Sequence, residues 1–255
     1  MTNQLQKMIY GSDFIAYKQV INTNNILPTI IFCHGFQSDM EGSKAVFLHD
    51  YCLTNGLNFI RFDYFGHGSS SGEFAGGTIS KWLSNVLQVI DNIATDSVIL
   101  VGSSMGGWLS LLSAIARPQK VVGLVGIASA PDFTEELIWQ AMNQDSKKEL
   151  ITKGMINFSK KNGSSFLNIT KDLIEDGRKH LLLSAKINID IPVILLHGIK
   201  DINVPFDYAL RTAKKLISQQ VTVVLVKASD HHMSLPSDLE LIAQSLQTIL
   251  ALCAA

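Results

Sequence analysis

The sequence predicts an α/β fold in which a mostly parallel sheet is covered by helices on both faces. Short, continuously apolar segments rich in Val and Ile alternate with segments of helical hydrophobic periodicity over most of the chain. This alternation is typical of parallel sheets that are buried on both faces. Hydrophobic residues also make up 47% of the 255 residues, which is enough for a large core.

Each predicted element has its own local pattern of apolar residues and turn formers. Strands are predicted as a hairpin over 6–21 around Gly11-Ser12-Asp13 and at 29–33, 57–64, 98–101, 121–129, 191–197 and 221–227. Helices are predicted at 42–55, at 79–94, from 105 to the residue before Pro118, at 206–217 and at 236–252.

Residues 132–186 interrupt the alternation. This span is richer in Lys, Asn and Gln, carries scattered bulky apolar residues and contains no continuous buried strand. We expect a cap of helices with a short hairpin near Asn162-Gly163, inserted into a core formed by residues 1–131 and 187–255. No Pro-rich or charged linker divides the chain further.

Composition excludes several classes of function. Lys and Arg number 21 and Asp and Glu 22, without a basic cluster, so nucleic acid is not an expected partner. No apolar run approaches the about 18 residues that a membrane span needs. Residues 1–13 lack an export or organelle signal, which predicts a cytoplasmic protein. The three widely spaced cysteines, Cys33, Cys52 and Cys253, are typical of free thiols. The oligomeric state stays open.

The segment from Ser97 to Pro118 contains the pattern Gly-x-Ser-x-Gly, with Ser104 as its serine. A serine on a sharp strand-to-helix turn presents its hydroxyl above the sheet, and the flanking glycines avoid collisions with neighbouring backbone. The pattern alone is weak, because a glycine-rich turn can also simply join a strand to a helix. Ser104 is therefore a candidate nucleophile that needs partners.

A nucleophilic serine needs a general base and an acid that orients the base, and both are expected at the carboxyl ends of later strands. Asp201 follows one of the last two predicted strands, and His231 and His232 follow the other. The order Ser, Asp, His is that of an α/β-hydrolase. The sequence favours His231 over His232 because His231 directly follows a small and an acidic residue, Ser229 and Asp230. Asp230 is the alternative acid.

Backbone amides can hold a developing oxyanion. This type of fold supplies one from the residue after the nucleophile and one from the loop after an early strand. These positions are Met105 and Phe36. His34 and His67 lie beside glycines and are interpreted as shaping their loops, and Asp63 is interpreted as structural.

Four segments carry a resemblance to a known family: RFDY at 61–64, GSSMGGWL at 102–109, ARPQKVVGLVGIASA at 116–130 and IEDGRKHLLL at 174–183. From about residue 5 to residue 250, the chain resembles the α/β-hydrolases that include the acyl-glucuronide esterase and palmitoyl-protein thioesterase of animal mitochondria and their bacterial relatives. The resemblance implies ester or thioester hydrolysis with Ser104, Asp201 and His231 as the triad. Those relatives often have arginine after the histidine, where this chain has His232.

The sequence thus predicts a serine hydrolase of small esters or thioesters with a hydrophobic acyl group, which needs no cofactor or metal. The apolar residues of the insertion are expected to wall the acyl pocket. One alternative is a peptidase resembling proline iminopeptidase, in which Glu135, Glu136 and Glu149 would hold a substrate amine, or an acyltransferase with the same triad. A non-enzymatic binding module is the other, and it is disfavoured because no triad residue is missing.

Overall fold

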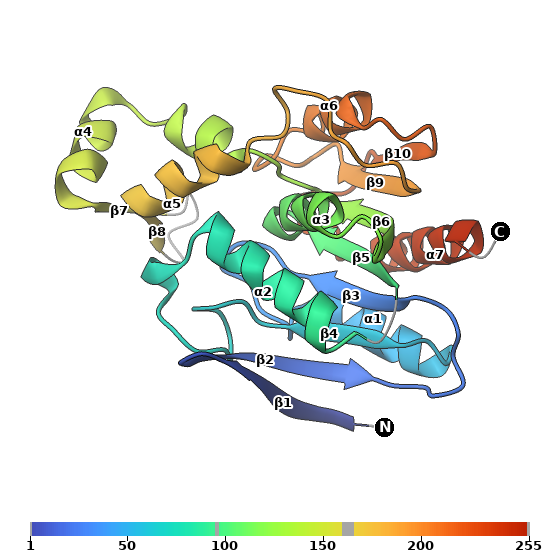
Figure 1. Cartoon of the computed structure of the whole chain (residues 1–255). Coiled ribbons are helices and arrows are strands. Elements are labelled where there is room, and N and C mark those ends of the chain that lie inside the picture. The colour runs from blue at the N-terminus through green and yellow to red at the C-terminus, as the bar shows by residue number, and fades with distance from the viewer. Residues whose placement is uncertain (1, 95–96, 160–165, 254–255) are drawn as a thin grey trace.

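The computed structural model describes residues 2–94, 97–159 and 166–253. Its centre is an eight-stranded sheet in the order β1-β2-β4-β3-β5-β6-β9-β10 (Figure 1). β1 pairs with β2, and β2 with β4, in antiparallel orientation, whereas the neighbours from β4 to β10 are parallel. The predicted mostly parallel α/β fold is confirmed.

The strands carry the apolar segments recognised in the sequence. Their bounds are β1 Thr2–Tyr10, β2 Asp13–Val20, β3 Thr29–Cys33, β4 Phe59–Phe62, β5 Val98–Ser103, β6 Val121–Ile127, β9 Val193–Gly198 and β10 Val221–Val226. The hairpin predicted around Gly11 is present, and Gly11 takes the positive φ of 60° that a tight turn favours. β3, β4, β5 and β9 are buried throughout, while the edge strand β10 is only partly buried.

Helices cover both faces of the sheet and create two apolar cores. The helices are α1 Ser43–Thr54, α2 Ile79–Asn92, α3 Met105–Ala116, α6 Asp207–Lys215 and α7 Pro236–Cys253. Trp82 of α2, Trp108 of α3 and Tyr208 of α6 pack in one core, and Leu48 of α1 and Ile242 of α7 pack in the other. The observed ends lie within a few residues of the predicted ones, because flanking residues continue into caps and turns.

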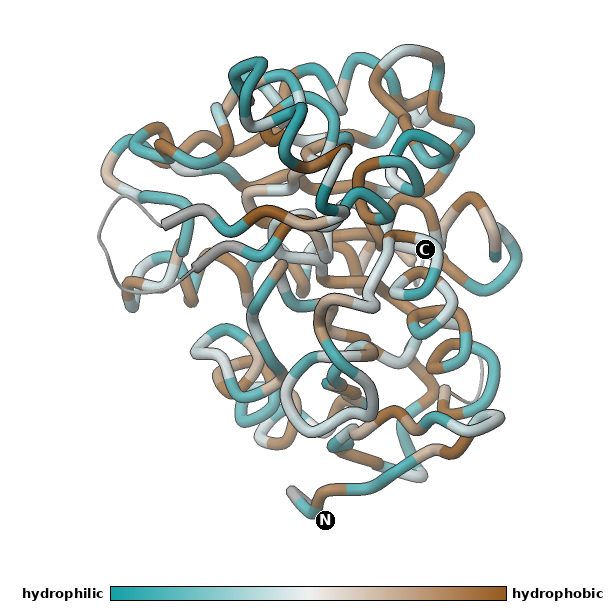
Figure 2. Tube along the Cα trace, turned by 90° about the vertical axis from the view of Figure 1, so that its left-hand side faces the viewer, coloured by the Kyte–Doolittle hydropathy of each residue, from teal (hydrophilic) through white to brown (hydrophobic). Residues whose placement is uncertain are grey.

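Between β6 and β9 the chain leaves the eight-stranded sheet. It forms the π-helical segment Thr134–Trp139, α4 Gln144–Lys153, the antiparallel strands β7 Met155–Ser159 and β8 Phe166–Thr170, and α5 Lys171–Gly177. β7 and β8 form a sheet of their own. Hydrophobic and hydrophilic residues alternate along this and the other outer segments (Figure 2). The turn predicted at Asn162-Gly163 lies outside the described residues.

The two ends of this segment meet at Asp132. Its carboxylate accepts hydrogen bonds from the backbone N–H groups of Leu182 and Leu183, at 2.8 and 2.9 Å. Nearby, the carboxylate of Glu136 accepts hydrogen bonds from two guanidinium N–H groups of Arg211, each at 2.7 Å. The two ends of the segment therefore lie close together, and the segment is held against α6.

The first turn of α3 approaches the loop after β3 very closely. A Cβ atom on Gly106 would lie 2.0 Å from the carbonyl oxygen of Cys33, and one on Gly102 would lie 2.4 Å from the carbonyl oxygen of Gly106. Both neighbours are backbone atoms, which cannot rotate away as a side chain can. Glycine is therefore required at both positions.

Gly106→Ala is expected to lower the free energy of unfolding by about 1–3 kcal/mol, because the added methyl group overpacks this contact. Urea denaturation measures the change. Gly76→Ala is the matched control, since its Cβ would meet only the ring of Phe65 at 3.4 Å, an ordinary contact. Equal stability of Gly106→Ala and the wild type would show that α3 and the loop after β3 do not pack this tightly.

Candidate active site

Ser104 occupies the turn between β5 and α3 with φ 54° and ψ −118°. Such backbone angles are rare for a residue with a Cβ atom and persist only where neighbouring structure holds them. The N–H of Ser104 donates to the carbonyl of Ile127 at 2.9 Å, and its carbonyl accepts from the N–H of Ala130 at 3.1 Å. β6 and the residues after it thus hold the strained turn from one side.

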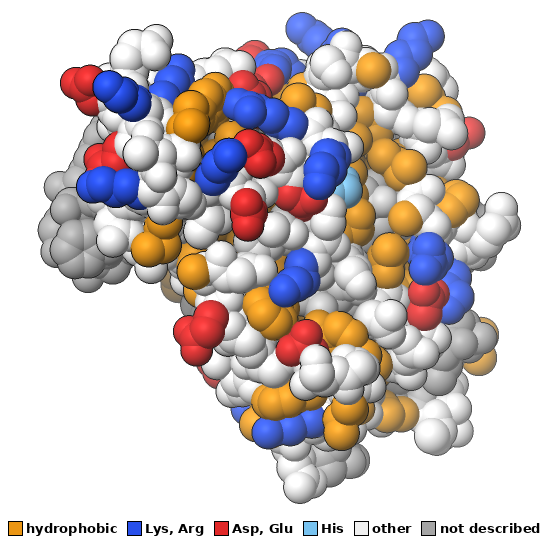
Figure 3. Space-filling view, turned by 60° about the vertical axis from the view of Figure 1, so that its left-hand side comes forward, with side chains coloured by type: hydrophobic (Ala, Val, Ile, Leu, Met, Phe, Trp, Pro, Cys, Tyr) orange, Lys and Arg blue, Asp and Glu red, His pale blue; other side chains and the backbone are white. Residues whose placement is uncertain are grey.

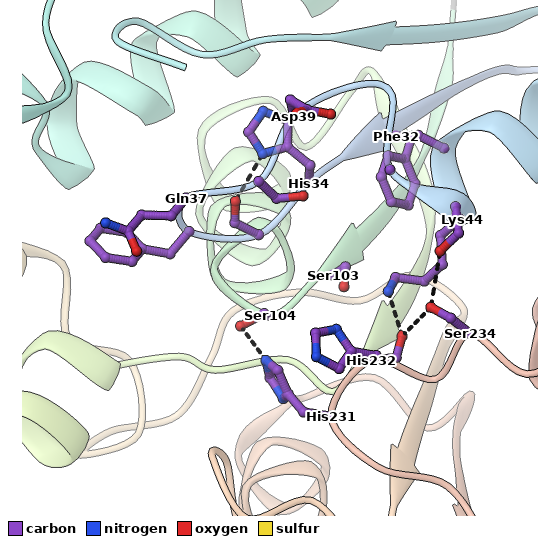
Figure 4. A pocket seen from close by; sticks show the side chains of 16 residues that line it. Phe32, His34, Gln37, Asp39, Lys44, Ser103, Ser104, His231, His232 and Ser234 are labelled. Atoms are coloured by element: carbon purple, nitrogen blue, oxygen red, sulfur yellow. Dashed lines mark hydrogen bonds between the residues drawn. The ribbon is translucent and has the colours of Figure 1, made fainter. Parts of the chain in front are cut away.

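His231 lies between Asp201 and Ser104. Its Nε2 is 3.1 Å from Oγ of Ser104 (Figure 4). Its Nδ1 is 2.7 Å from Oδ2 of Asp201. A carboxylate accepts hydrogen bonds only, so the proton of a neutral imidazole resides on Nδ1 and Nε2 is free to accept from the serine hydroxyl. The three residues predicted from the sequence are therefore side by side.

The two alternative residues lie elsewhere in the same loop. The ring of His232 is 6.2 Å from that of His231, centroid to centroid. Oδ1 of Asp230 accepts from the backbone N–H groups of His232 and Met233, at 2.9 and 3.3 Å, so this carboxylate shapes the loop. The geometry favours His231 and Asp201 over His232 and Asp230.

The carboxylate of Asp201 is buried and hydrogen-bonded at both oxygens. Oδ1 accepts from the N–H groups of Asn203 and Val204 at 2.9 and 2.8 Å, while Oδ2 faces His231. Burial by itself would raise the pKa of Asp201. Hydrogen bonds from His197 and His231 outweigh it and hold the pKa well below its usual range. Asp201 is therefore a stable anion at neutral pH.

The structure adds His197, which the sequence gives no reason to single out. It lies near the end of β9 and is completely buried. Its Nε2 is 3.0 Å from the carbonyl oxygen of Val204 and 3.2 Å from Oδ2 of Asp201. In the sequence, His197 is distinguished only as a polar residue in an otherwise apolar strand, four positions before Asp201. This pattern does not indicate which groups the imidazole contacts.

The loop that contains Phe36 lies against Ser104. A Cβ atom on Gly35 would be 3.3 Å from Cβ of Ser104. The ring of Phe36 fixes the loop by contacts with the rings of Trp82 and Phe133, at centroid distances of 5.7 and 5.5 Å. In the described part of the chain, the N–H groups of Phe36 and Met105 donate to no protein acceptor. Both amides are thus available to an oxygen atom beside Ser104.

A buried polar cluster supports this loop from behind. Asp63 accepts the N–H of Met40 at 2.7 Å and that of Ser69 at 2.8 Å, and burial raises its pKa to about 6. Nδ1 of His34 donates to the carbonyl of Gly35, and Nδ1 of His67 to that of Phe65. These contacts agree with the interpretation of Asp63 as structural and of the two histidines as shaping their loops.

A cavity of about 300 Å³ opens beside Ser104 (Figure 4). Its walls come from β3 and the loop that follows it, the first turn of α1, Ser103 and Ser104, and the loop 231–234. None of the described residues between 132 and 186 lines this cavity, so the expectation that the insertion walls an acyl pocket stays a prediction. The apolar side chain of Phe133 is packed instead against Phe36 and Trp108.

The remaining findings concern the cysteines, metal-binding groups, membrane-spanning helices and surface charge. Cys33, Cys52 and Cys253 are free, as predicted. Across the described ranges, His, Cys, Asp and Glu side chains form no group of three that could hold a metal ion. In the same ranges, no helix is both long and apolar enough to span a membrane. On the face in Figure 3, Lys and Arg side chains are mingled with Asp and Glu.

Comparison with known proteins identifies the family of the chain. Residues 25–170 match the family model described as "Serine aminopeptidase, S33". Over 237 residues the chain is 41% identical to the mitochondrial palmitoyl-protein thioesterase ABHD10 of Rattus norvegicus, covering 92% of this chain and 78% of that protein. The chain belongs to this family of α/β-hydrolases.

Two solved structures of α/β-hydrolase type superpose on nearly the whole chain. The mouse α/β-hydrolase domain-containing protein 10 is 38% identical with a TM-score of 0.89, covering 97% of this chain and 98% of its own. A protein from Agrobacterium vitis S4 is 34% identical with a TM-score of 0.91 and the same coverage. The protein is therefore a hydrolase with the α/β-hydrolase fold.

The stability of this α/β-hydrolase is expected to fall in mild acid. Burial lowers the pKa of His34 to about 3, with a further contribution from neighbouring His67, and burial lowers the pKa of His67 to about 4. In the unfolded chain, histidines take up protons below a pH of about 6.5, so lowering the pH favours unfolding. The pKa of Asp63 is raised to about 6, so protonation of this carboxyl stabilises the folded state as the pH falls from about 6 to the ordinary pKa of an aspartate. The two histidines together change the free energy of unfolding by more than this one carboxyl.

Urea denaturation should therefore show a loss of about 2 kcal/mol in the free energy of unfolding between pH 6.5 and 5. His67→Phe keeps the ring contacts and should flatten this dependence. His232→Gln, at an exposed histidine, is the control and should leave it unchanged. A His67→Phe variant with the wild-type pH dependence would contradict the assignment.

Proposed function

We propose that this protein is a serine hydrolase that cleaves acyl thioesters or carboxylic esters through an acyl-enzyme on Ser104. The observation that carries the proposal is the position of His231, within hydrogen-bonding distance of both Asp201 and Ser104. The relatives named palmitoyl-protein thioesterase, up to 41% identical, support thioesters as a substrate class.

In the first half of the reaction, His231 Nε2 takes the proton of the Ser104 hydroxyl while Oγ attacks the acyl carbon. Asp201 keeps the imidazole oriented and stabilises the imidazolium that forms. The N–H groups of Phe36 and Met105 hold the oxyanion of the tetrahedral intermediate. The bond to the leaving sulfur or oxygen then breaks, and the leaving group takes the proton from His231.

In the second half, water replaces the leaving group. His231 takes a proton from the water as its oxygen attacks the acyl carbon of the Ser104 ester. The second tetrahedral intermediate collapses, Ser104 recovers its proton from His231, and the free acid departs. Apart from the substrate and one water molecule, no group outside the chain is needed to balance these steps.

We assign a hydrophobic acyl group to the aromatic side of Ser104, where Phe36 meets Phe133. Residues 132–186 act as a cap on the core formed by 1–131 and 187–255. This division is supported by the contacts of Asp132 with Leu182 and Leu183, which join the two ends of the cap.

Ser104→Ala and Asp201→Asn are expected to lower kcat by about 10³-fold or more on p-nitrophenyl esters and on matching acyl thioesters. Ser104→Ala removes the nucleophile, and Asp201→Asn removes the charge that fixes the proton of His231 on Nδ1. Asp230→Asn is the matched control, because it changes the neighbouring carboxylate that shapes the loop, and it should retain activity within a few fold. Near-wild-type turnover by Ser104→Ala would remove this serine from the mechanism.

A peptidase is the second candidate, because the matching family model is described as a serine aminopeptidase. The glutamates that could hold a substrate amine are already paired. Glu135 lies 2.7 Å from Arg178, Glu136 2.7 Å from Arg211 and Glu149 2.8 Å from Lys153. These pairs disfavour recognition of an amine.

Aminoacyl p-nitroanilides are therefore expected to be cleaved far more slowly than p-nitrophenyl esters by the wild type. Kinetic assays of both series at equal concentration measure the ratio, and an acceptor alcohol added to the ester assay detects acyl transfer. Labelling by a fluorophosphonate probe in the wild type, absent in Ser104→Ala, separates any enzyme from a binding module. Faster cleavage of the anilides would favour the peptidase.

A cytoplasmic location remains part of the proposal. The relatives from animals are named as mitochondrial proteins. Fractionation of cells that produce the chain distinguishes the two locations.

A further inference from the structure

The cavity beside Ser104 is polar at the end away from the candidate nucleophile. There it is lined by Ser43 and Lys44 of α1 and by His232 and Ser234 of the loop after β10 (Figure 4). At about 300 Å³ it lies at the lower limit of small-molecule sites and corresponds to about ten water molecules. It therefore suits a small group.

Among the described residues that line this cavity, Lys44 is the one lysine or arginine and Asp39 is the one aspartate or glutamate. Its ammonium donates to the carbonyl oxygen of His232 and forms no ion pair with any described carboxylate. Burial lowers the pKa of Lys44 to about 8, so that the side chain is still mostly charged at neutral pH. A partly desolvated cation with a single neutral acceptor has donor capacity left for an anion.

Two carboxylates near Lys44 favour its charged form without pairing with it: those of Asp230 and Asp238. Both carboxylates already accept hydrogen bonds from neighbouring groups of the chain. Asp230 accepts from backbone N–H groups of that loop, and Asp238 accepts from the Ser229 hydroxyl and from the N–H of Leu235. They balance part of the charge of Lys44 but leave its ammonium available to the cavity.

The first turn of α1 adds to the positive character of this wall. Its N-cap, Gly42, has no side chain that could accept from the first N–H groups, and no acidic residue lies in the first turn. The residues from Gly42 to Ala45 line the cavity. The uncapped amides and the helix dipole favour an anion beside Lys44.

We propose that this cavity binds a phosphate group carried by a small leaving group of the substrate, and that Lys44 is the residue that recognises it. A lysine beside the uncapped N–H groups of a helix suits a tetrahedral phosphate, whereas a planar carboxylate is matched better by the fork of an arginine. The hydroxyl of Ser43 donates to Ser234 and that of Ser234 to the carbonyl of His232, so these two serines shape the wall. The inference rests on the proposed function, because it names the side of Ser104 on which the leaving group lies.

The substrate class is then an acyl ester or thioester of a short phosphorylated alcohol or thiol. Attack by Ser104 Oγ breaks the bond between the acyl carbon and the leaving oxygen or sulfur. That atom takes the proton from His231, and the phosphorylated alcohol or thiol leaves through the polar cavity. The acyl group stays on Ser104 until water releases it.

Lys44 also has a structural contact that a test must separate from recognition. Together with the contact between the hydroxyl groups of Ser43 and Ser234, at 3.1 Å, its bond to His232 ties α1 to the loop that carries His231. Loss of a purely structural contact would impair every substrate equally. Loss of a phosphate contact would impair only substrates that carry phosphate.

The experiment compares 1-decanoylglycerol 3-phosphate with 1-decanoylglycerol, which share the acyl chain and the ester bond, for the wild type, Lys44→Met and Lys44→Arg. The wild type should prefer the phosphate ester. In Lys44→Met, kcat/KM for that substrate should fall about tenfold, mainly through KM, as expected for one charge-assisted hydrogen bond. Hydrolysis of the neutral ester should stay within about twofold, and Lys44→Arg should restore part of the preference.

Lys214→Met, at an exposed lysine of α6, is the control and should leave both rates unchanged. An equal loss on both esters would assign Lys44 to holding the loop and overturn the proposal, as would a wild type without preference.

Calorimetric titration with glycerol 3-phosphate gives a second readout that needs no turnover. Binding by the wild type and by Ser104→Ala, but not by Lys44→Met, supports the subsite even if neither ester is cleaved and the proposed function fails. Absence of binding to the wild type overturns the subsite.

Discussion

The contact between the first turn of α3 and the loop after β3 is the constraint on which the site depends. Gly106 lies so close to the carbonyl of Cys33 that a methyl group would not fit. α3 therefore begins immediately above the sheet, and the chain must enter it through a left-handed residue at Ser104. The same closeness brings Gly35 against Ser104, so that the amide of Phe36 and that of Met105 lie near one hydroxyl group.

Burial acts in two opposite ways on the ionisable groups around this turn. Asp201 keeps its charge because His197, His231 and two backbone N–H groups satisfy the carboxylate. His34 and His67 have one ring nitrogen each without a hydrogen-bond partner in the described structure, and burial keeps them neutral. Asp201 is thus an anion beside His231, whereas His34 and His67 are neutral behind the loop of Phe36. This arrangement favours proton transfer at His231 alone.

The surroundings of Ser104 are divided into an aromatic side and a polar side. Phe36, Phe133 and Trp108 form a continuous set of ring contacts toward the segment that leaves the sheet after β6. Lys44 and its serine neighbours lie on the other side, between α1 and the loop after β10. An ester or thioester has a similar division between its acyl chain and its leaving group, and the proposed orientation of the substrate follows from this match.

The sequence by itself determined the elements, their order and the residue types at Ser104, Asp201 and His231, because each rests on a local pattern: apolar periodicity, a glycine-flanked turn, or a polar residue directly after a strand. Patterns of this kind also place the insertion between β6 and β9. Only the tertiary structure decided which side chains meet. His197 reaches Asp201, Lys44 reaches the loop of His231, and Phe133 of the insertion meets the ring of Phe36. Such contacts depend on the order in which strands pair and on the side on which each loop leaves the sheet, and neither is encoded in any single stretch of the chain.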